Sequence, residues 1–499
     1  MNTLVRIVAL CAVCSSAGSL AAVPGSSMKA DESSLSCIPA AKPFYARAWE
    51  ALSNVHLDEA RDLFAQTVAV DPGCTLAWAQ LGAVTPGTNG RKMVDDAVAA
   101  SALLGEVERL QVLALASQHR GDNEQALWLF RSALSYAPRS FELNFAVAQR
   151  AGVLRLWQEM VIPARRATEL APERGPGWNL LGYANVGLKQ HEQAVAAFRQ
   201  YAEVAPMEPN AHDSLGDALL ANNQLDEALA AYQRALDTSG GSFWASNHGV
   251  ATVDVLQGDW FSARAAIEKA RHSATQDDDR LRLMEWTAWS YLADSQPGEA
   301  FRAVDELEQD ARRIGLEARV ADARLLRGRF FLAQGRYRDA LTRFIVMGAQ
   351  KLPTLNEGQK LSVEAVRLHG IVEALARLGN VAEAEKTLGA LRALFESRPR
   401  DVQGLDALAH ARGLIALQKK DPARAISAFM QCSEGYDGCR LNLAEAQEAI
   451  GDPAEAGRTR ALVRLANHRD PEYWWVFMRA GLGRKDAEPR AQEENRARW

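Results

Sequence analysis

Apolar, small and proline positions recur along this 499-residue chain with a fixed spacing. The spacing is clearest where Pro138, Pro172 and Pro206 follow one another at intervals of 34 residues. A constant period of this size indicates stacked copies of one small supersecondary unit. Proline cannot continue a helix and restricts the residue before it, so each proline is expected to end one unit and begin the next. The pattern therefore predicts a series of helix pairs.

The unit that ends at Pro206 resembles a tetratricopeptide repeat. Its matching positions are Trp178, Leu181, Gly182, Ala194, Phe198 and Pro206. The next unit repeats the register with Leu215, Gly216, Ala228 and Tyr232. The resemblance implies that the glycines and alanines let two helices approach, and that Phe198 and Tyr232 fill the gap toward the next unit. The implied fold is all-α, a right-handed superhelical α-solenoid.

Weaker copies of the same pattern extend almost to the end of the chain. They include Ala263 with Ile267, Ala340 with Phe344, Ala384 with Leu388, and Ala425 with Phe429. Together with earlier copies they predict about twelve helix pairs, each stabilised by its neighbours. We expect a signal peptide at 1–21, a linker at 22–41, an array with clearer consensus at 42–240, a degenerate array at 241–466, and an aromatic cap with a charged tail at 467–499.

The first 21 residues have the features of a secretory signal peptide. Arg6 precedes an apolar run from Ile7 to Val13, and Ser19 and Ala21 occupy the small-residue positions before a cleavage site. The run is shorter than the roughly 20 residues of a membrane-spanning helix. We expect an exported protein, periplasmic or extracellular, with a retained N-terminal anchor as the alternative. The residues before Cys14 do not match a bacterial lipoprotein signal, which disfavours a lipid anchor.

Four cysteines remain after the signal peptide. In a helical hairpin the start of the first helix lies beside the end of the second, and Cys37 and Cys74 flank the first hairpin at those ends. Cys432 and Cys439 bracket a short junction between two later helices. We predict Cys37–Cys74 and Cys432–Cys439 disulfides in an oxidising compartment. The alternative is four buried, reduced thiols.

Composition and motifs favour a binding protein over an enzyme. The net charge is −5 and no basic stripe is present, so a nucleic-acid partner is not expected. No two of the nine histidines are three or four residues apart, and the chain has no phosphate-binding glycine loop and no Gly-x-Ser-x-Gly turn. The acidic run that begins at Asp277 lacks the ligand spacing of a calcium loop and reads as a helix start. We expect no catalytic residue, metal or cofactor.

The resemblance also implies where a partner would bind. In this family the first helix of each unit lines a concave groove, and the groove offsets transfer to a set of polar and aromatic positions. They are Asn179, Tyr183, Asp213, Asp217, His248, Thr252, Glu285, Trp289, Arg329, His369 and Glu373. The alternative is that they are merely solvated helix faces. They do not reproduce the set that clamps a peptide carboxylate in some family members.

The C-terminal segment is a second candidate surface. Tyr473, Trp474, Trp475 and Phe477 make it unusually aromatic. A helix here is predicted to cap the last repeat, because terminal repeats expose an apolar face. The alternative is an anchor for a partner or for the surface of a membrane, since Trp and Tyr favour both.

These features lead to two hypotheses of function. The first is a non-enzymatic exported scaffold that binds a partner protein or peptide in its groove. The second is an accessory subunit of an envelope or cell-surface enzyme or secretion complex. The partner's identity and the oligomeric state are not encoded in any motif of the chain.

Overall fold

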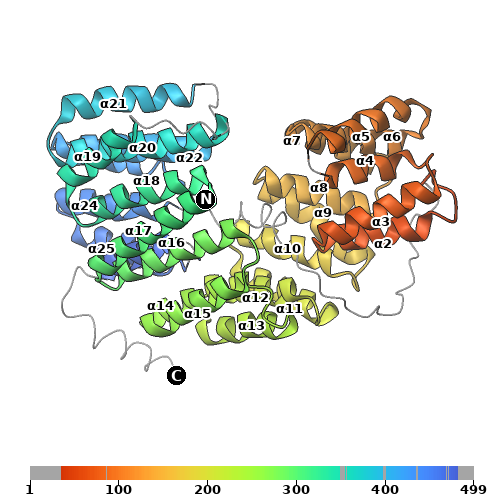
Figure 1. Cartoon of the computed structure of the whole chain (residues 1–499), viewed down its shortest axis with the longest axis horizontal. Coiled ribbons are helices and arrows are strands. Elements are labelled where there is room, and N and C mark those ends of the chain that lie inside the picture. Colours follow the sequence, from red (N-terminus) through yellow and green to blue (C-terminus); the bar gives the residue numbers. More distant parts are fainter. Residues whose placement is uncertain are drawn as a thin grey trace. The chain divides into compact units, whose positions relative to one another are not determined.

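The protein is an array of paired α-helices (Figure 1). The computed structural model describes residues 35–481, except Pro86, 349–354, Asn356, 397–400, 434–435, His468 and Asp470. Those residues contain 25 α-helices, one short 3₁₀ helix and no strand. The α-helices form 12 consecutive pairs, from α2/α3 to α24/α25, and a single helix α26 follows. The all-α repeat fold and the expected number of pairs are confirmed. The proposed signal peptide and the charged tail lie outside the described residues.

The chain divides into two compact units with a boundary between Ser246 and Asn247. The helices of unit 1 are α2 (Lys42–Ser53), α3 (Leu57–Val70), α4 (Thr75–Val84), α5 (Gly87–Ala100), the 3₁₀ helix (Ser101–Leu103), α6 (Glu106–His119), α7 (Asn123–Tyr136), α8 (Phe141–Val153), α9 (Trp157–Leu170), α10 (Gly175–Gly187), α11 (His191–Val204), α12 (Pro209–Ala221) and α13 (Leu225–Thr238).

Unit 2 begins within α14, which runs from Ala245 to Gln257. Its further helices are α15 (Trp260–Ser273), α16 (Asp277–Ala293), α17 (Pro297–Ile314), α18 (Glu317–Ala333), α19 (Tyr337–Gly348), α20 (Glu357–Arg377), α21 (Val381–Leu394), α22 (Val402–Gln418), α23 (Pro422–Phe429), α24 (Asp437–Ala449), α25 (Pro453–Arg464) and α26 (Pro471–Gly481). No helix among the described residues is both long enough and apolar enough to span a bilayer.

A glycine on the first helix of a pair lies against an aromatic ring on the second. A Cβ atom added to Gly182 would lie 2.5 Å from the Phe198 ring, and one added to Gly216 would lie 2.5 Å from the Tyr232 ring. Two pairs of unit 2 have the same contact at the same separation of 16 residues, Gly328 with Phe344 and Gly413 with Phe429. The degenerate repeats thus keep the packing of the clear ones.

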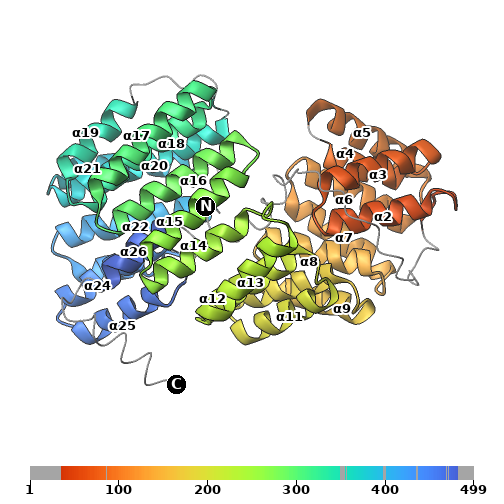
Figure 2. The same ribbon diagram turned by 60° about the horizontal axis from the view of Figure 1, so that its bottom comes forward.

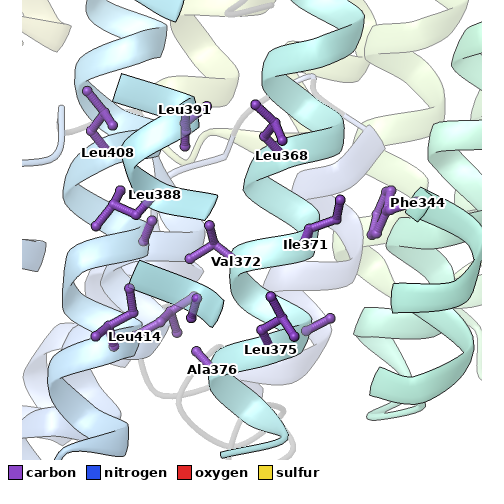
Figure 3. Packing of buried hydrophobic residues seen from close by; sticks show 14 of the residues in the cluster. Phe344, Leu368, Ile371, Val372, Leu375, Ala376, Leu388, Leu391, Leu408 and Leu414 are labelled. Atoms are coloured by element: carbon purple, nitrogen blue, oxygen red, sulfur yellow. The ribbon is translucent and has the colours of Figure 1, made fainter. Parts of the chain in front are cut away.

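The aromatic rings pack within their own helix pair, which differs from the expectation from the sequence. Phe198 and Tyr232 lie on the glycines of their own pairs, whereas the expectation was that they fill the gap toward the next unit. Phe344 fills both roles, because its ring also meets Gly370 in the following pair. The Phe344 ring belongs to a core of unit 2 (Figure 3) whose aliphatic members include Leu368, Ile371, Val372, Leu388 and Leu408.

A side chain six residues after each repeat proline binds the carbonyl oxygen of that proline. The Trp178 indole N–H donates to the Pro172 carbonyl at 2.8 Å, and the His212 Nε2–H donates to the Pro206 carbonyl at 2.8 Å. Two earlier pairs repeat the contact, with Trp78 on Pro72 at 3.0 Å and Asn144 on Pro138 at 3.2 Å. Carbonyl groups at a helix junction have no hydrogen-bond donor within the helices. Each of these side chains supplies that donor.

Both expected disulfides are present in the structure. Cys37 and Cys74, with Cα atoms 4.6 Å apart, join the segment before α2 to the residue before α4. Cys432 and Cys439, with Cα atoms 6.5 Å apart, join the segment after α23 to the first turn of α24. Asp71 supports the first link, because its carboxylate accepts hydrogen bonds from the backbone of Ile38 at 2.8 Å and of Gly73 at 3.0 Å.

Candidate functional site

Helix α26 lies on the side of unit 2 that is formed by first helices of the pairs. It packs against α16 and α24, which are first helices four pairs apart, and against α25 (Figure 2). We call this side of unit 2 its inner face. The C-terminal helix therefore caps the last pair, as the sequence predicts, and also reaches across to an earlier pair.

Aromatic residues fix α26 at two points. Tyr473 is 3% exposed, and its hydroxyl donates to the Val463 carbonyl at 3.0 Å and accepts from the Asn467 N–H at 3.0 Å. Trp474 is fully buried, with its ring 5.8 Å from that of His248. His248 in turn stacks on Trp286 at 3.5 Å between ring centroids. Trp475 and Phe477 are only half-buried.

An ion pair and a cation–π contact complete this contact area. Glu472 of α26 pairs with Arg329 of α18, and the Arg329 guanidinium lies 5.1 Å from the centre of the Trp289 ring. Trp289 is itself buried against Phe330. We call His248, Trp286, Trp289 and Arg329 the α26 seat. The sequence predicts the groove and the C-terminal segment as separate candidate surfaces, whereas in the structure His248 and Arg329 of the groove set contact α26.

A polar cluster lies on the same inner face, with His410 buried and the other two residues half-buried. His369 and Glu373 are one turn apart on α20, and His410 comes from α22. His369 Nε2 lies 2.9 Å from His410 Nδ1, and one potential ligand atom from each of the three residues falls within 4.8 Å of the others. Burial lowers the pKa of His369 to about 4, with a contribution from Arg329. It also lowers the pKa of His410 and raises that of Glu373, so both imidazoles are neutral at neutral pH.

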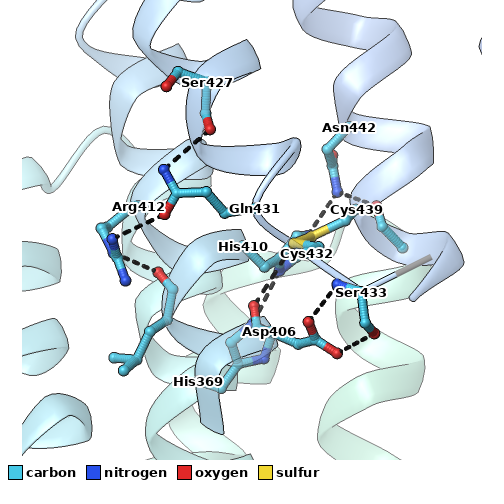
Figure 4. The surroundings of a disulfide bond; sticks show 12 residues. His369, Asp406, His410, Arg412, Ser427, Gln431, Cys432, Ser433, Cys439 and Asn442 are labelled. Carbon is cyan, nitrogen blue, oxygen red and sulfur yellow. Dashed lines mark hydrogen bonds between the residues drawn. A yellow bond between two sulfur atoms is a disulfide. The ribbon is translucent and has the colours of Figure 1, made fainter. Parts of the chain in front are cut away.

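A second layer of polar side chains orients His410 (Figure 4). The Asn442 Nδ2 group donates to His410 Nε2 at 2.8 Å, and Asn442 Oδ1 accepts from Arg377 Nη2 at 2.5 Å. Arg377 also makes a bidentate pair with Glu445, at 2.8 and 2.9 Å. The Cys432–Cys439 disulfide holds the start of α24 beside these residues, one turn from Asn442.

The sequence reading omitted several residues of this cluster. His410 falls three residues before Gly413, as Asn179 and Asp213 fall three before Gly182 and Gly216. Applying that offset once more would therefore have found it. Asn442, Arg377 and Glu445 give no comparable signal, because only the fold brings α24 beside α20 and α22.

The expected groove residues of unit 1 make hydrogen bonds within the array. Tyr183 is buried, and its hydroxyl lies 2.9 Å from Ser214 Oγ, which donates weakly to Asn179 at 3.5 Å. Asp213 is buried and accepts from Ser246 at 2.7 Å. Asp217 accepts from the Tyr232 hydroxyl at 2.8 Å. A role of these four residues in partner binding stays a prediction.

Two expected positions of unit 2 lie outside the α26 seat. Thr252 is fully buried, and its hydroxyl donates to the His248 carbonyl of its own helix at 2.8 Å. Glu285 is half-buried near Asp322. Burial, followed by the charge of Glu285, raises the pKa of Asp322 to about 6. A role of these two residues in partner binding stays a prediction.

Comparisons with known proteins agree with the repeat assignment. Residues 165–243 match the family model described as tetratricopeptide repeat. A search of curated proteins found no match.

Several solved structures share parts of this fold. A thermophilic TPR protein of Thermus thermophilus is 22% identical, with a TM-score of 0.31, over 36% of this chain and 96% of its own. MamA from Desulfovibrio magneticus RS-1 is 19% identical, with a TM-score of 0.32, over 34% of this chain and 97% of its own. PilW, described as a type IV pilus biogenesis factor, is 20% identical, with a TM-score of 0.35, over 41% and 92%. Similarities at this level carry no conclusion about function.

Proposed function

We propose that this tetratricopeptide repeat protein is a non-enzymatic, exported scaffold, and that the inner face of unit 2 binds a helical segment of a partner protein. Repeat proteins of this architecture bury an amphipathic helix or an extended peptide against the first helices of their pairs. The observation that carries the proposal is α26 itself, because a short helix already occupies this face through one aromatic and one ionic contact.

The α26 seat defines the chemistry of the ligand. Its Arg329 favours a carboxylate, and its stacked His248 and Trp286 rings favour an indole placed two residues later, as in Glu472-x-Trp474. Acidic and aromatic side chains two positions apart point about 200° apart around a helix. A helix that uses both must therefore lie between Arg329 on one side and the His248 and Trp286 rings on the other. We expect a partner helix with this acidic-x-Trp pattern.

The resident helix is suited to exchange. The Arg329–Glu472 pair is partly exposed, at 29% and 43% of the two side chains, so water can compete for it. The Trp474 indole N–H is buried and finds no hydrogen-bond acceptor among the described residues. Leaving such a donor unpaired costs on the order of 1–3 kcal/mol, and this cost is relieved when α26 leaves and the indole meets water.

Export is part of the proposal, and two features support it. Disulfides persist in oxidising compartments and are rare in the cytosol, and this chain forms two, Cys37–Cys74 and Cys432–Cys439. Residues 1–21 have the signal-peptide pattern described above. N-terminal sequencing of the protein from its native host should find a mature chain that begins near Ala22, and a chain that begins at Met1 would contradict cleavage.

A peptide-binding experiment tests the role of the inner face. In a released variant, Glu472→Arg with Trp474→Ala, the first change is repelled by Arg329 and the second removes the buried indole. We expect a labelled peptide of residues 469–481 to bind this variant. If the free helix binds at about 10 μM, a tethered helix at an effective concentration of about 1 mM makes binding to the wild type about a hundredfold weaker.

Matched changes identify the surface that binds the peptide. Adding Arg329→Ala to the released variant should abolish binding, while Arg302→Ala, at an exposed position on the second helix α17, should leave it unchanged. If the folded released variant does not bind the peptide, α26 is a permanent cap and the inner face of unit 2 is not the binding surface.

A further inference from the structure

We propose that His369, Glu373 and His410 form a binding site for a divalent transition-metal cation on the inner face of unit 2. The proposal does not rest on partner binding, and no motif in the sequence assigns this site. Helix α20 supplies an imidazole and a carboxylate four residues apart, a spacing that places both on one helix face. Helix α22 supplies the second imidazole.

The geometry suits one small cation. Two nitrogens bound to a tetrahedral Zn²⁺ at about 2.05 Å lie roughly 3.3 Å apart. His369 Nε2 and His410 Nδ1 already lie 2.9 Å apart, so a shift of a few tenths of an ångström makes room for the ion. One Glu373 carboxylate oxygen and one nitrogen of each ring lie within 4.8 Å of one another, so Glu373 completes a set of two imidazoles and one carboxylate. Such a set favours Zn²⁺ or Co²⁺ over Ca²⁺ or Mg²⁺, which prefer oxygen ligands.

The charges around Glu373 are largely balanced. Of the three guanidinium groups that act on Glu373, Arg377 pairs with Glu445 and Arg329 pairs with Glu472, while Arg479 is exposed on α26. Glu373 has no such matching cation among the salt bridges of the described residues. A bound metal ion would supply the opposite charge that this carboxylate lacks in a buried position.

The proton of His410 must move when the metal binds. Asn442 donates to His410 Nε2, so the imidazole carries its proton on Nδ1 and donates it to His369. A metal ion takes the place of this proton between the two rings. The proton then sits on Nε2, and the Asn442 amide must turn so that its oxygen accepts it. This rearrangement opposes binding and makes position 442 a sensitive test of the proposal.

The first test is a Zn²⁺ titration of the full-length, oxidised protein after removal of metal by chelation. We expect one ion per chain by calorimetry and by metal analysis after gel filtration. Glu373→Gln and His369→Gln should each weaken binding at least tenfold. Glu383→Gln on α21 and His272→Gln on α15 change exposed side chains outside the cluster and should have no effect.

The second test changes the orienting residue. Asn442→Asp provides a carboxylate that accepts from His410 Nε2–H, the arrangement that commonly supports metal-bound histidine. It should tighten Zn²⁺ binding several-fold, with no change in the far-ultraviolet circular dichroism spectrum. The proposal is overturned if the wild type binds no Zn²⁺, if the folded Glu373→Gln and His369→Gln variants bind as tightly as the wild type, or if Asn442→Asp fails to tighten binding.

Discussion

The two units bring distant first helices together by different means. In unit 1, Trp49 of α2 packs edge-on against Phe141 and Phe145 of α8, with ring centroids 5.7 and 5.2 Å apart. The Arg174 guanidinium lies over Phe141 at 3.9 Å and pairs with Glu50 at 3.1 Å. This contact is mainly aromatic and uses a helix of the first repeat. In unit 2 the corresponding role belongs to α26, an additional helix beyond the twelve pairs.

The difference lies on the inner faces, since the helix pairs themselves are alike. The glycine–aromatic contact has the same separation at Gly182 and Phe198 in unit 1 and at Gly413 and Phe429 in unit 2. On the inner face of unit 2, Arg329 instead pairs with Glu472 of α26, and His369 meets His410. Repeat packing thus fixes the scaffold in both units, and residues that depart from the repeat pattern determine what each inner face can bind.

Removal of a disulfide should have the largest effect on stability, and the size of the effect should differ between the two units. The Cys37–Cys74 link spans 37 residues and the Cys432–Cys439 link spans 7. Chain-entropy estimates give about 4 kcal/mol for the longer loop and about 2 kcal/mol for the shorter. Denaturant unfolding of Cys37→Ser/Cys74→Ser and Cys432→Ser/Cys439→Ser variants should show the greater loss in unit 1. Equal losses would mean that loop length does not control the difference.

Two tryptophans allow the α2–α8 contact of unit 1 to be compared directly with the α26 contact of unit 2. Trp49→Ala should lower the unfolding free energy of unit 1 by about 4 kcal/mol, because it leaves a cavity between α2 and α8. Trp474→Ala removes an equally buried ring but should release mainly α26. Native-state hydrogen exchange should then show lost protection in α26 and retained protection in α16 to α24. Loss of protection throughout unit 2 would make α26 part of the core and would argue against its exchange for a partner helix.

The glycine contacts should be equally sensitive in both units. Gly182→Leu and Gly413→Leu each create a steric clash with an aromatic ring. A Cβ atom alone would lie 2.5 Å from the Phe198 ring in the first case and 2.3 Å from the Phe429 ring in the second. We expect a loss of about 3 kcal/mol for each, confined to the unit that carries the change. A Cβ atom added to Gly389 on α21 would meet no atom within 4 Å, so Gly389→Leu should stabilise its helix slightly. A harmless Gly413→Leu would show that the degenerate repeats are packed differently.

The sequence predicts the scaffold far better than the inner face. The repeat period and the positions of the glycines and aromatic residues locate the twelve pairs. This works because the contacts within a pair, such as Gly182 on Phe198, join residues only 16 positions apart in one repeat. The α26 contact joins Arg329 to Glu472, and the polar cluster joins Arg377 to Glu445. Those pairs are separated by several repeats, and no local pattern links their members. Tyr183 occupies a position within the repeat that lines the groove in this family, yet its side chain is buried by the array. Position within the repeat determines which way a side chain points, but it does not determine whether neighbouring residues cover it.

The smallest predicted effect concerns a single buried carboxylate in unit 2. Burial, with a contribution from Asp259, raises the pKa of Asp254 to about 6. Because this value exceeds the pKa of an unfolded aspartate, the charged form is disfavoured in the folded state at neutral pH. Stability should therefore rise as the pH falls from 7 through 6 toward 4. Asp254→Asn should add about 1 kcal/mol at pH 7 and remove that rise, after allowance for partial solvation.

An exposed aspartate of unit 1 is the matched control for this change. Asp62→Asn on α3 should leave the stability at pH 7 unchanged, because that side chain is exposed in the folded state. Denaturant unfolding at pH 7 and pH 5 measures both variants. If Asp254→Asn is neutral at pH 7 and keeps the wild-type pH dependence, the first helix of unit 2 holds its carboxylate in contact with water. The polar character of unit 2 would then be confined to the α26 seat and the His369–Glu373–His410 cluster.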